Sequence, residues 1–305
     1  MPETSTHLNY TDPVFIVGML RSGTTLLQGI LNNTGKYFPV PETHFFSQVT
    51  YSLPENDLSL RDRKTIQQIL NRKSRIKVPE SALSNLNSQK EIFEYVIGMF
   101  NPGQINTFLE KTPRHVFFYN KILRYYPTAK FICMVREPKN IVSSRYGKNP
   151  NRKKSVIRLS LLYNKIAAAI LKILDKDNVI LVRYEDLTDE NERTLKVICE
   201  FLDMAYDGKF LENIVAPKEI VSEHEFWKNN NLTLETIKKN NPDKWRSTLR
   251  IDQAHLVNYI TRSYAEEFGY SSGHEWAQVG KGFGRDIFRM IKPGEFKKLI
   301  SKVHG

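Results

Sequence analysis

The sequence has little cysteine, and neither of its two cysteines lies in a CxxC pair. Cys133 and Cys199 both stand in apolar surroundings, where a free thiol behaves as a small hydrophobic side chain. We therefore expect two buried free thiols and no disulfide framework. Histidine, cysteine and carboxylate residues also lack the spacing of a metal site, so the sequence predicts chemistry that needs no metal ion.

Long apolar runs are absent as well. No segment approaches the roughly 18 consecutive apolar residues that a transmembrane helix needs. The polar N-terminal arm at 1–12 also lacks the apolar core of a signal peptide. We therefore expect a cytoplasmic protein without a membrane span.

Signatures of nucleic-acid binding are missing too, although the chain carries a net charge of +12. No zinc finger, helix-turn-helix or RNA-binding motif accompanies that charge, so no nucleic-acid partner is expected. The excess of positive charge instead favours anionic partners such as nucleotide phosphates or acidic glycans.

The segment from Pro13 to Asn33 has the pattern of a strand, a glycine-bounded turn and a helix. Residues 14–17 form a short apolar run that is typical of a buried parallel strand. From Thr24 onward, apolar residues recur at helical spacing, which predicts a helix there. A strand, loop and helix in this order aim backbone N–H groups and a helix dipole at one place, which makes an anion-binding site.

The spacing Gly18-x4-Gly23-Thr24-Thr25 is that of a nucleotide P-loop with one change. A nucleoside-triphosphatase has lysine directly after the second glycine, where it reaches the β- and γ-phosphates. Thr24 stands at that position, and the cation has moved into the loop as Arg21. The loop is therefore poorly equipped for a triphosphate, but Arg21 can hold a doubly charged 5′-group as a fork-shaped donor.

The run RSGTTLL after an apolar strand resembles the loop that binds the 5′-phosphosulfate in sulfotransferases using 3′-phosphoadenosine-5′-phosphosulfate (PAPS). The resemblance is to bacterial-type, carbohydrate and protein-tyrosine members. It implies a single α/β domain over 1–305, with a P-loop and three α/β/α layers around a central, mostly parallel sheet. It also implies a sulfotransferase whose donor is PAPS, whose product is adenosine 3′,5′-bisphosphate (PAP), and whose loop binds through Arg21, Ser22, Gly23, Thr24 and Thr25.

Glu42 stands just before His44 and two phenylalanines, after a segment that two prolines keep extended. One interpretation is a loop whose aromatic side chains fill the core while Glu42 points to solvent. The E-x-H-F-F context is, however, similar to that of the catalytic glutamate in heparan sulfate 3-O-sulfotransferases. The resemblance implies that Glu42 is the general base, with His44 as the alternative.

The motif EKTP at 110–113 follows a predicted strand at 105–109. A charged residue at the carboxyl end of a parallel strand faces the ligand crevice of a doubly wound sheet. EKTP resembles the EK[ST]P of carbohydrate sulfotransferases, which implies that Lys111 is a catalytic cation near the transferring group, together with Arg21. Pro113 occupies the position of the catalytic histidine of cytosolic members, and His115 is either a substitute or a capping or packing residue.

The motif VREP at 135–138 follows the most strand-like run, 129–135. It resembles the 3′-phosphate site of the family, which implies that Arg136 and, eight residues later, Ser144 bind that phosphate. A guanidinium at a strand end and a hydroxyl on the next helix suit one oxyanion. Ser143 is the alternative hydroxyl.

Two further motifs follow in the second half of the chain. RYEDL at 183–187 comes after a predicted strand at 179–182 and resembles the family element that places a tyrosine, here Tyr184, near the adenine. The KWR run is similar to an element of related enzymes, which implies that Lys244 or Arg246 closes over the nucleotide. The alternative is that the tryptophan between them is a packing anchor with incidental charges.

The remaining segments are read more coarsely. Residues 51–104 form an expected helical insertion, a candidate lid over the acceptor, and the basic tail at 280–305 is interpreted as a docking helix or partner surface. Helices are expected at 57–73, 88–99, 114–125, 140–146, 155–174, 188–202, 233–239 and 252–268.

Two rival functions stay open at this point. A P-loop kinase or NTPase would need the missing lysine and an acidic residue for magnesium at a strand end, where Arg136 stands instead. A non-catalytic protein that binds PAP or PAPS is the other rival, and Glu42 and Lys111 argue against it. The acceptor, whether a small molecule, a glycan or a peptide, and the oligomeric state are not specified by the sequence.

Overall fold

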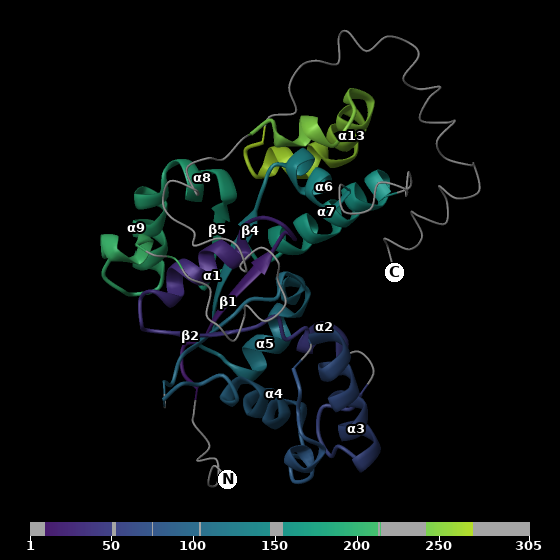
Figure 1. Ribbon diagram of the computed structural model, residues 1–305, viewed down its shortest axis with the longest axis vertical. Coiled ribbons are helices and arrows are strands. Elements are labelled where there is room, and N and C mark those ends of the chain that lie inside the picture. Colours follow the sequence, from purple (N-terminus) through teal and green to yellow (C-terminus); the bar gives the residue numbers. More distant parts are fainter. Residues whose placement is uncertain are drawn as a thin grey trace, which may run out of the picture. The chain divides into compact units, whose positions relative to one another are not determined.

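The structure is a computed structural model, and the parts of the chain that it describes are residues 10–50, 53–74, 76–103, 105–146, 155–212, 214 and 242–270 (Figure 1). The helix expected at 233–239 and the basic tail at 280–305 lie outside the described residues. The chain divides into two compact units. The first comprises Met1–Arg136 and Ala169–Pro242, and the second Glu137–Ala168 and Asp243–Gly305. The single domain expected over 1–305 stays a prediction.

A five-stranded parallel sheet forms the centre of the first unit (Figure 1). Its order is β2-β3-β1-β4-β5, and every neighbouring pair runs parallel. The α/β fold with a parallel central sheet is therefore confirmed. The strands are β1 (Val14–Gly18), β2 (Phe38–Val40), β3 (Phe108–Glu110), β4 (Lys130–Val135) and β5 (Val179–Arg183).

Helices cover both faces of this sheet, with α1 (Thr24–Asn32) and α9 (Asn191–Phe201) on one side (Figure 1). Alternate residues of β1 and β4, such as Ile16 and Ile132, join the apolar side chains of these helices in one core cluster. On the other face Phe15 and Phe131 stack with ring centroids 5.5 Å apart. Burying a Phe, Leu or Ile side chain stabilises a fold by about 1.5–3 kcal/mol. Every residue of β1 is buried, as expected for the central strand of the sheet.

The helices of the insertion begin later than expected because side-chain caps set their first residues. Asp57 has a positive φ of 53°, and Ser59 forms a capping box with Asp62. Helix α3 (Leu60–Ile69) therefore begins after residue 57, and it continues as a π-helical turn, η1 (Leu70–Ser74). Helix α4 (Gln89–Gly98) has a similar capping box. The short elements around them are α2 (Phe45–Gln48) and η2 (Glu80–Leu83).

Three other expected elements differ at their ends. The strand expected at 105–109 begins only at Phe108, because the Asn101 side chain holds residues 103 and 105 in a turn. The helix expected at 114–125 is a 3-10 helix, η3 (Pro113–Phe118), followed by α5 (Tyr119–Tyr125). The helix expected at 188–202 is two helices, since α8 (Tyr184–Asp189) begins directly after β5 and Glu190 separates it from α9. A further 3-10 turn, η4, covers Gly208–Leu211.

The second unit is helical in its described part. Trp245 and Leu249 pack with residues such as Val142 and Val257 in its own apolar cluster. Helix α7 ends three residues earlier than expected and crosses the boundary between the units. The elements are α6 (Pro138–Tyr146), α7 (Ser155–Leu171), the 3-10 helix η5 (Lys244–Ser247) and α13 (Ile251–Glu267).

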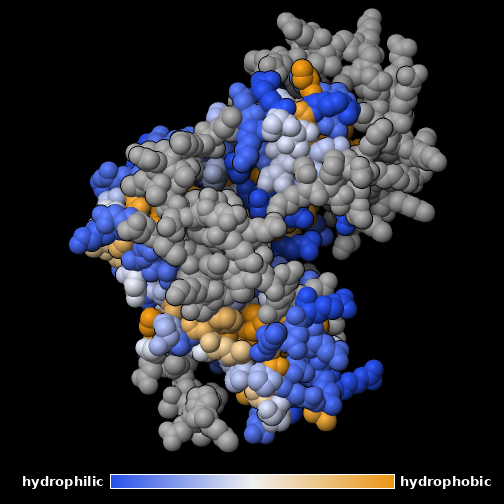
Figure 2. All heavy atoms as spheres, in the orientation of Figure 1, coloured by the Kyte–Doolittle hydropathy of each residue, from blue (hydrophilic) through white to orange (hydrophobic). Residues whose placement is uncertain are grey.

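Both cysteines are buried free thiols, as the sequence predicts. Burial raises the pKa of Cys133, on the central strand β4, to about 12, and it also raises the pKa of Cys199 on α9. The described surface is mostly hydrophilic in the view of Figure 2, and hydrophobic residues gather mainly in the lower half of that view. None of the described helices combines the length and the apolar character that crossing a membrane requires.

Candidate active site

The candidate site lies along one edge of the sheet, where all five parallel strands end. Glu42 comes two residues after β2, Lys111 directly follows β3, and Arg136 directly follows β4. The loop from Met19 to Gly23 follows β1, and Tyr184 follows β5. In the sheet, β3 and then β2 lie on one side of β1, and β4 lies on its other side. The strand order therefore reverses at β1. The carboxyl ends beside such a switch point form the ligand crevice of a doubly wound sheet.

Backbone contacts hold the loop after β1 in place. The Met19 N–H donates to the Met134 carbonyl at 2.8 Å, and the Ser22 hydroxyl donates to the carbonyls of Met19 and Met134 at 2.6 and 3.3 Å. The Ser22 side chain is fully buried by these contacts, so its backbone N–H is the group it can offer an anion. Helix α1 begins directly afterwards, and the first turn of a helix presents N–H groups without intrahelical partners.

Tyr184 and Arg136 pack against this loop. A Cβ atom added at Gly23 would lie 2.4 Å from the Tyr184 ring, so this position needs glycine. The Arg136 guanidinium lies 4.0 Å from the centre of the Tyr184 ring and donates to the Arg21 carbonyl at 3.2 Å. Partial burial and the neighbouring Arg136 lower the pKa of Arg21, while Glu42 acts in the opposite direction. The loop, Arg136 and Glu42 are therefore within electrostatic reach of one another.

We expect Gly23→Ala to destabilise the fold more than Gly35→Ala does. Both glycines have positive φ values, 83° and 68°, so both substitutions carry the left-handed strain of about 1–2 kcal/mol. Only at Gly23 must the methyl group also displace the Tyr184 ring, because nothing lies within 4 Å of the corresponding position at Gly35. Thermal unfolding of the two variants measures the difference. Equal losses would show that the ring does not lie against Gly23.

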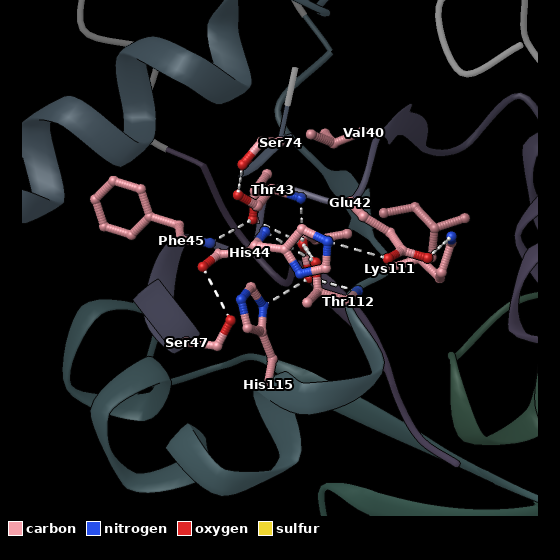
Figure 3. A network of polar contacts seen from close by, with 12 residues as sticks. Val40, Glu42, Thr43, His44, Phe45, Ser47, Ser74, Lys111, Thr112 and His115 are labelled. Carbon is pink, nitrogen blue, oxygen red and sulfur yellow. Dashed lines mark hydrogen bonds and ion pairs between the residues drawn. The ribbon is translucent and has the colours of Figure 1, made fainter. Parts of the chain in front are cut away.

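Glu42 lies between a lysine and a histidine (Figure 3). The Lys111 Nζ donates to Glu42 Oε1 at 2.6 Å, and the His44 Nε2 lies 3.3 Å from Glu42 Oε2. The Lys111 side chain is 2 % exposed, whereas that of Glu42 is 27 % exposed. Of the interpretation in which the aromatic side chains fill the core and Glu42 points to solvent, the first part is correct, because Phe45 and Phe46 are buried. The second part is wrong, because Glu42 is held in an ion pair. Burial lowers the pKa of His44, and Glu42 partly opposes that shift.

A second polar group, missed from the sequence, lies behind this pair. Glu110 is fully buried, and its carboxylate accepts hydrogen bonds from Thr43 and Thr112 and lies 2.9 Å from His115 Nδ1. His115 is fully buried as well, with its ring 5.1 Å from that of Phe46. His115 is therefore a packing residue of the kind that one interpretation expected. The signal for this cluster was the combination of a carboxylate, a threonine and a histidine at 110, 112 and 115.

Three predicted site residues belong to the second unit. Ser144 lies half-buried on α6, while the Ser143 hydroxyl is buried and donates to the Asn140 carbonyl at 3.1 Å. Lys244 and Arg246 lie on η5. Trp245 between them is buried in the apolar cluster of this unit, so it is a packing anchor. Contacts of these residues with a nucleotide stay a prediction.

Among the described residues of both units, no three His, Cys, Asp or Glu side chains gather as a possible metal site.

Two relatives share sequence with this chain at moderate identity. An uncharacterized protein of Aquifex aeolicus is 24 % identical over 212 residues, covering 66 % of this chain and 26 % of that protein. Protein-tyrosine sulfotransferase A of Caenorhabditis elegans is 27 % identical over 218 residues, covering 67 % of this chain and 53 % of that protein. The chain therefore matches about a quarter and about half of the lengths of these relatives.

Solved structures with a similar fold are sulfotransferase domains. The domain from the olefin synthase of Synechococcus PCC 7002 has a TM-score of 0.60 and 21 % identity, covering 88 % of this chain and 98 % of that domain. The domain from the curacin biosynthetic pathway has a TM-score of 0.56 and 18 % identity, covering 86 % and 99 %. A family model described as the sulfotransferase family matches residues 13–208, which contain the loop, Glu42, Lys111, Arg136 and Tyr184. The resemblance noted in the sequence is thus confirmed, and the chain belongs to the sulfotransferase family.

Proposed function

We propose that this protein transfers a sulfuryl group from PAPS to a hydroxyl or amine of an acceptor and releases PAP. The observation that carries the proposal is the Glu42–Lys111 ion pair, which follows β2 and β3 at the same carboxyl edge of the sheet as the loop after β1. Sulfuryl transfer, like phosphoryl transfer, needs a held anion, charge stabilisation and a base for the nucleophile. Membership of the sulfotransferase family supports the same class of reaction.

The donor half of the site fits a nucleotide with two anionic groups. The loop amides from Arg21 to Thr25, with the Arg21 guanidinium, are proposed to bind the 5′-phosphosulfate. Arg136 is proposed to bind the 3′-phosphate, and its Nε is a buried donor that has no hydrogen-bond partner among the described residues, which suits an anionic ligand. Tyr184, which stacks on Arg136, is proposed to contact the adenine. Ser144, Lys244 and Arg246 complete the proposed nucleotide contacts.

The acceptor half of the site is proposed to contain the base. Glu42 takes the proton from the acceptor hydroxyl as the acceptor oxygen bonds to sulfur. The bond between sulfur and the bridging oxygen of the 5′-phosphate breaks, and its electron pair stays on that oxygen. Lys111 and Arg21 stabilise the charge on the leaving phosphate. Because the Lys111 Nζ is 2.6 Å from Glu42, the same ammonium group also orients the carboxylate.

The helical insertion is proposed to contribute to acceptor binding. Its π-helical turn contacts the loop that carries Glu42, since the Ser74 hydroxyl donates to the Thr43 carbonyl. π-Helical turns are often found at functional sites. This contact supports the interpretation of the insertion as part of a lid over the acceptor.

Ligand-dependent thermal unfolding tests the proposed donor. At a concentration of 100 Kd, a ligand stabilises the folded state by about 2.7 kcal/mol, so PAP is expected to raise the Tm clearly. Magnesium–ATP is expected to leave the Tm unchanged, because Thr24 replaces the lysine that reaches the β- and γ-phosphates. Stabilisation by magnesium–ATP and not by PAP would favour a kinase or NTPase instead.

Turnover distinguishes the enzyme from a nucleotide-binding protein without activity. We would incubate the protein with labelled PAPS and separate panels of phenols, sterols, amines, glycans and peptides. Transfer of label to one panel identifies the acceptor class. Binding of PAP together with no transfer to any panel would support the non-catalytic alternative.

A further inference from the structure

Glu110 has no part in the proposed chemistry, yet it is a fully buried carboxylate next to the site. We propose that Glu110 is a positioning residue that joins the loop carrying Glu42 to the segment carrying Lys111, and so holds their ion pair. The joining of the two segments is a structural inference, whereas its effect on catalysis rests on the proposed function.

The contacts of Glu110 use both carboxylate oxygens. Oε1 accepts from the hydroxyls of Thr112 and Thr43, at 2.5 and 2.9 Å, and from the Thr43 N–H at 3.4 Å. Oε2 accepts from the Thr112 N–H at 3.1 Å and lies 2.9 Å from His115 Nδ1. A carboxylate has about four lone-pair sites, so these contacts saturate it. Thr43, Thr112 and His115 are fully buried like Glu110 itself.

These partners lie next to the site residues in the chain. Thr43 stands between Glu42 and His44, and Thr112 directly follows Lys111. The Thr112 hydroxyl also accepts from the His44 N–H at 3.3 Å. Adjacent Cα atoms are about 3.8 Å apart, so a shift of Thr43 or Thr112 moves its neighbours. Through Thr43 and Thr112, Glu110 therefore controls the backbone on both sides of the Glu42–Lys111 contact.

The network begins where the sheet ends. Pairing of β2 with β3 stops at Val40 and Glu110, and among the described residues the ladder between the two segments does not continue beyond this point. The Glu110 side chain supplies the connection there instead. Burial by itself raises the pKa of Glu110, but the His115 ring and the hydroxyls of Thr112 and Thr43 outweigh it and hold that pKa below its usual value. The carboxylate is thus kept ionised as an acceptor for all these donors.

Substitutions at Thr112 test the inference while leaving every charged group in place. Thr112→Val removes the hydroxyl that contacts Glu110 and the His44 N–H, and Thr112→Ser restores it. Thr261→Val is the matched control, because the Thr261 hydroxyl is also fully buried but donates to the Val257 carbonyl on α13. Amide hydrogen exchange of the peptide at 40–46 measures how firmly the loop that carries Glu42 is held, and it does so independently of catalysis.

In Thr112→Val we expect the amides of Thr43 and His44 to exchange about tenfold faster. A change of that size corresponds to the net contribution of one hydrogen bond to stability. The single-turnover rate of transfer is expected to fall by about 10- to 100-fold, because small misplacements of reacting groups are costly. The affinity for PAP is expected to stay at the wild-type value, and Thr112→Ser is expected to restore both the exchange and the rate.

Glu110→Gln provides a second variant, because the Thr43 and Thr112 N–H groups donate to different carboxylate oxygens and glutamine replaces one of these oxygens by an NH2 donor. Wild-type exchange at 40–46 in Thr112→Val and Glu110→Gln would overturn the inference. So would faster exchange with an unchanged rate, since the network would then be structural only. Failure of the wild type to bind PAP would refute the proposed function instead, and exchange would still decide whether Glu110 holds the loop.

Discussion

Glu42→Gln is expected to lower the single-turnover rate of sulfuryl transfer by about 10²–10⁴, the usual contribution of general-base catalysis. The substitution keeps the size of the side chain and its hydrogen bond to Lys111, but it removes the group that takes the proton. Binding of PAP should stay nearly unchanged, because the nucleotide contacts come from other residues. The measurement is transfer at saturating PAPS with the acceptor that the panels identify.

His44→Ala is the informative comparison for this variant. The His44 Nε2 lies 3.3 Å from Glu42 Oε2. We expect His44→Ala to lower the transfer rate less than Glu42→Gln does, because His44 orients Glu42 or the acceptor. If Glu42→Gln keeps most of the rate and His44→Ala loses it, then His44 is the base and our assignment is wrong. If both variants keep the rate, the base comes from another part of the chain or from the acceptor itself.

A stability measurement must accompany this experiment. The Lys111 side chain is 2 % exposed and loses its ionic partner in Glu42→Gln. The amide oxygen still accepts from the Lys111 ammonium group, but a largely buried charge has lost its opposite charge, so the Tm of the variant should fall. Rates therefore have to be compared at a temperature where both proteins are folded.

Arg136→Ala is expected to weaken binding of PAP by roughly 2–5 kcal/mol, the cost of truncating one partner of a buried charge pair. The substitution also removes the stacking on Tyr184 and the hydrogen bond to the Arg21 carbonyl. Arg136→Lys should recover only part of the loss, because an ammonium group has no planar fork of donors. Calorimetric titration measures the affinities.

Adenosine 5′-phosphosulfate separates the 3′-site from a general loss of affinity. This ligand lacks the 3′-phosphate, so it should bind weakly to the wild type and respond little to Arg136→Ala. Arg193→Ala, at an exposed ion pair on α9, is the control and should bind PAP like the wild type. Equal losses for both ligands in Arg136→Ala would show that Arg136 does not recognise the 3′-phosphate.

The central strands were predictable because their sequence is unambiguous. The expected runs at 14–17 and 179–182 lie within β1 and β5, and that at 129–135 differs from β4 by one residue. Local patterns of this kind depend on burial of every residue in a short segment. The strand-end positions of Lys111 and Arg136 followed from the same reasoning.

Elements whose boundaries depend on side chains were harder to predict. The start of α3 is set by Ser59 and Asp62, a pair that resembles any polar loop until the cap is recognised. The role of Glu110 is hidden in the sequence for a different reason. A carboxylate beside Lys111 looks like a surface charge, and only the pairing of β2 with β3 brings Thr43 to it across 67 residues of chain.

The two buried thiols give this protein a pair of intrinsic reporters. Cys133 lies inside the sheet and Cys199 on a helix that covers it, and these are the chain's only cysteines. Because the thiolate is the reactive form and burial raises both pKa values, a thiol reagent modifies each cysteine only when its surroundings open. Labelling followed by mass spectrometry can therefore resolve whether α9 separates from the sheet before the sheet itself comes apart.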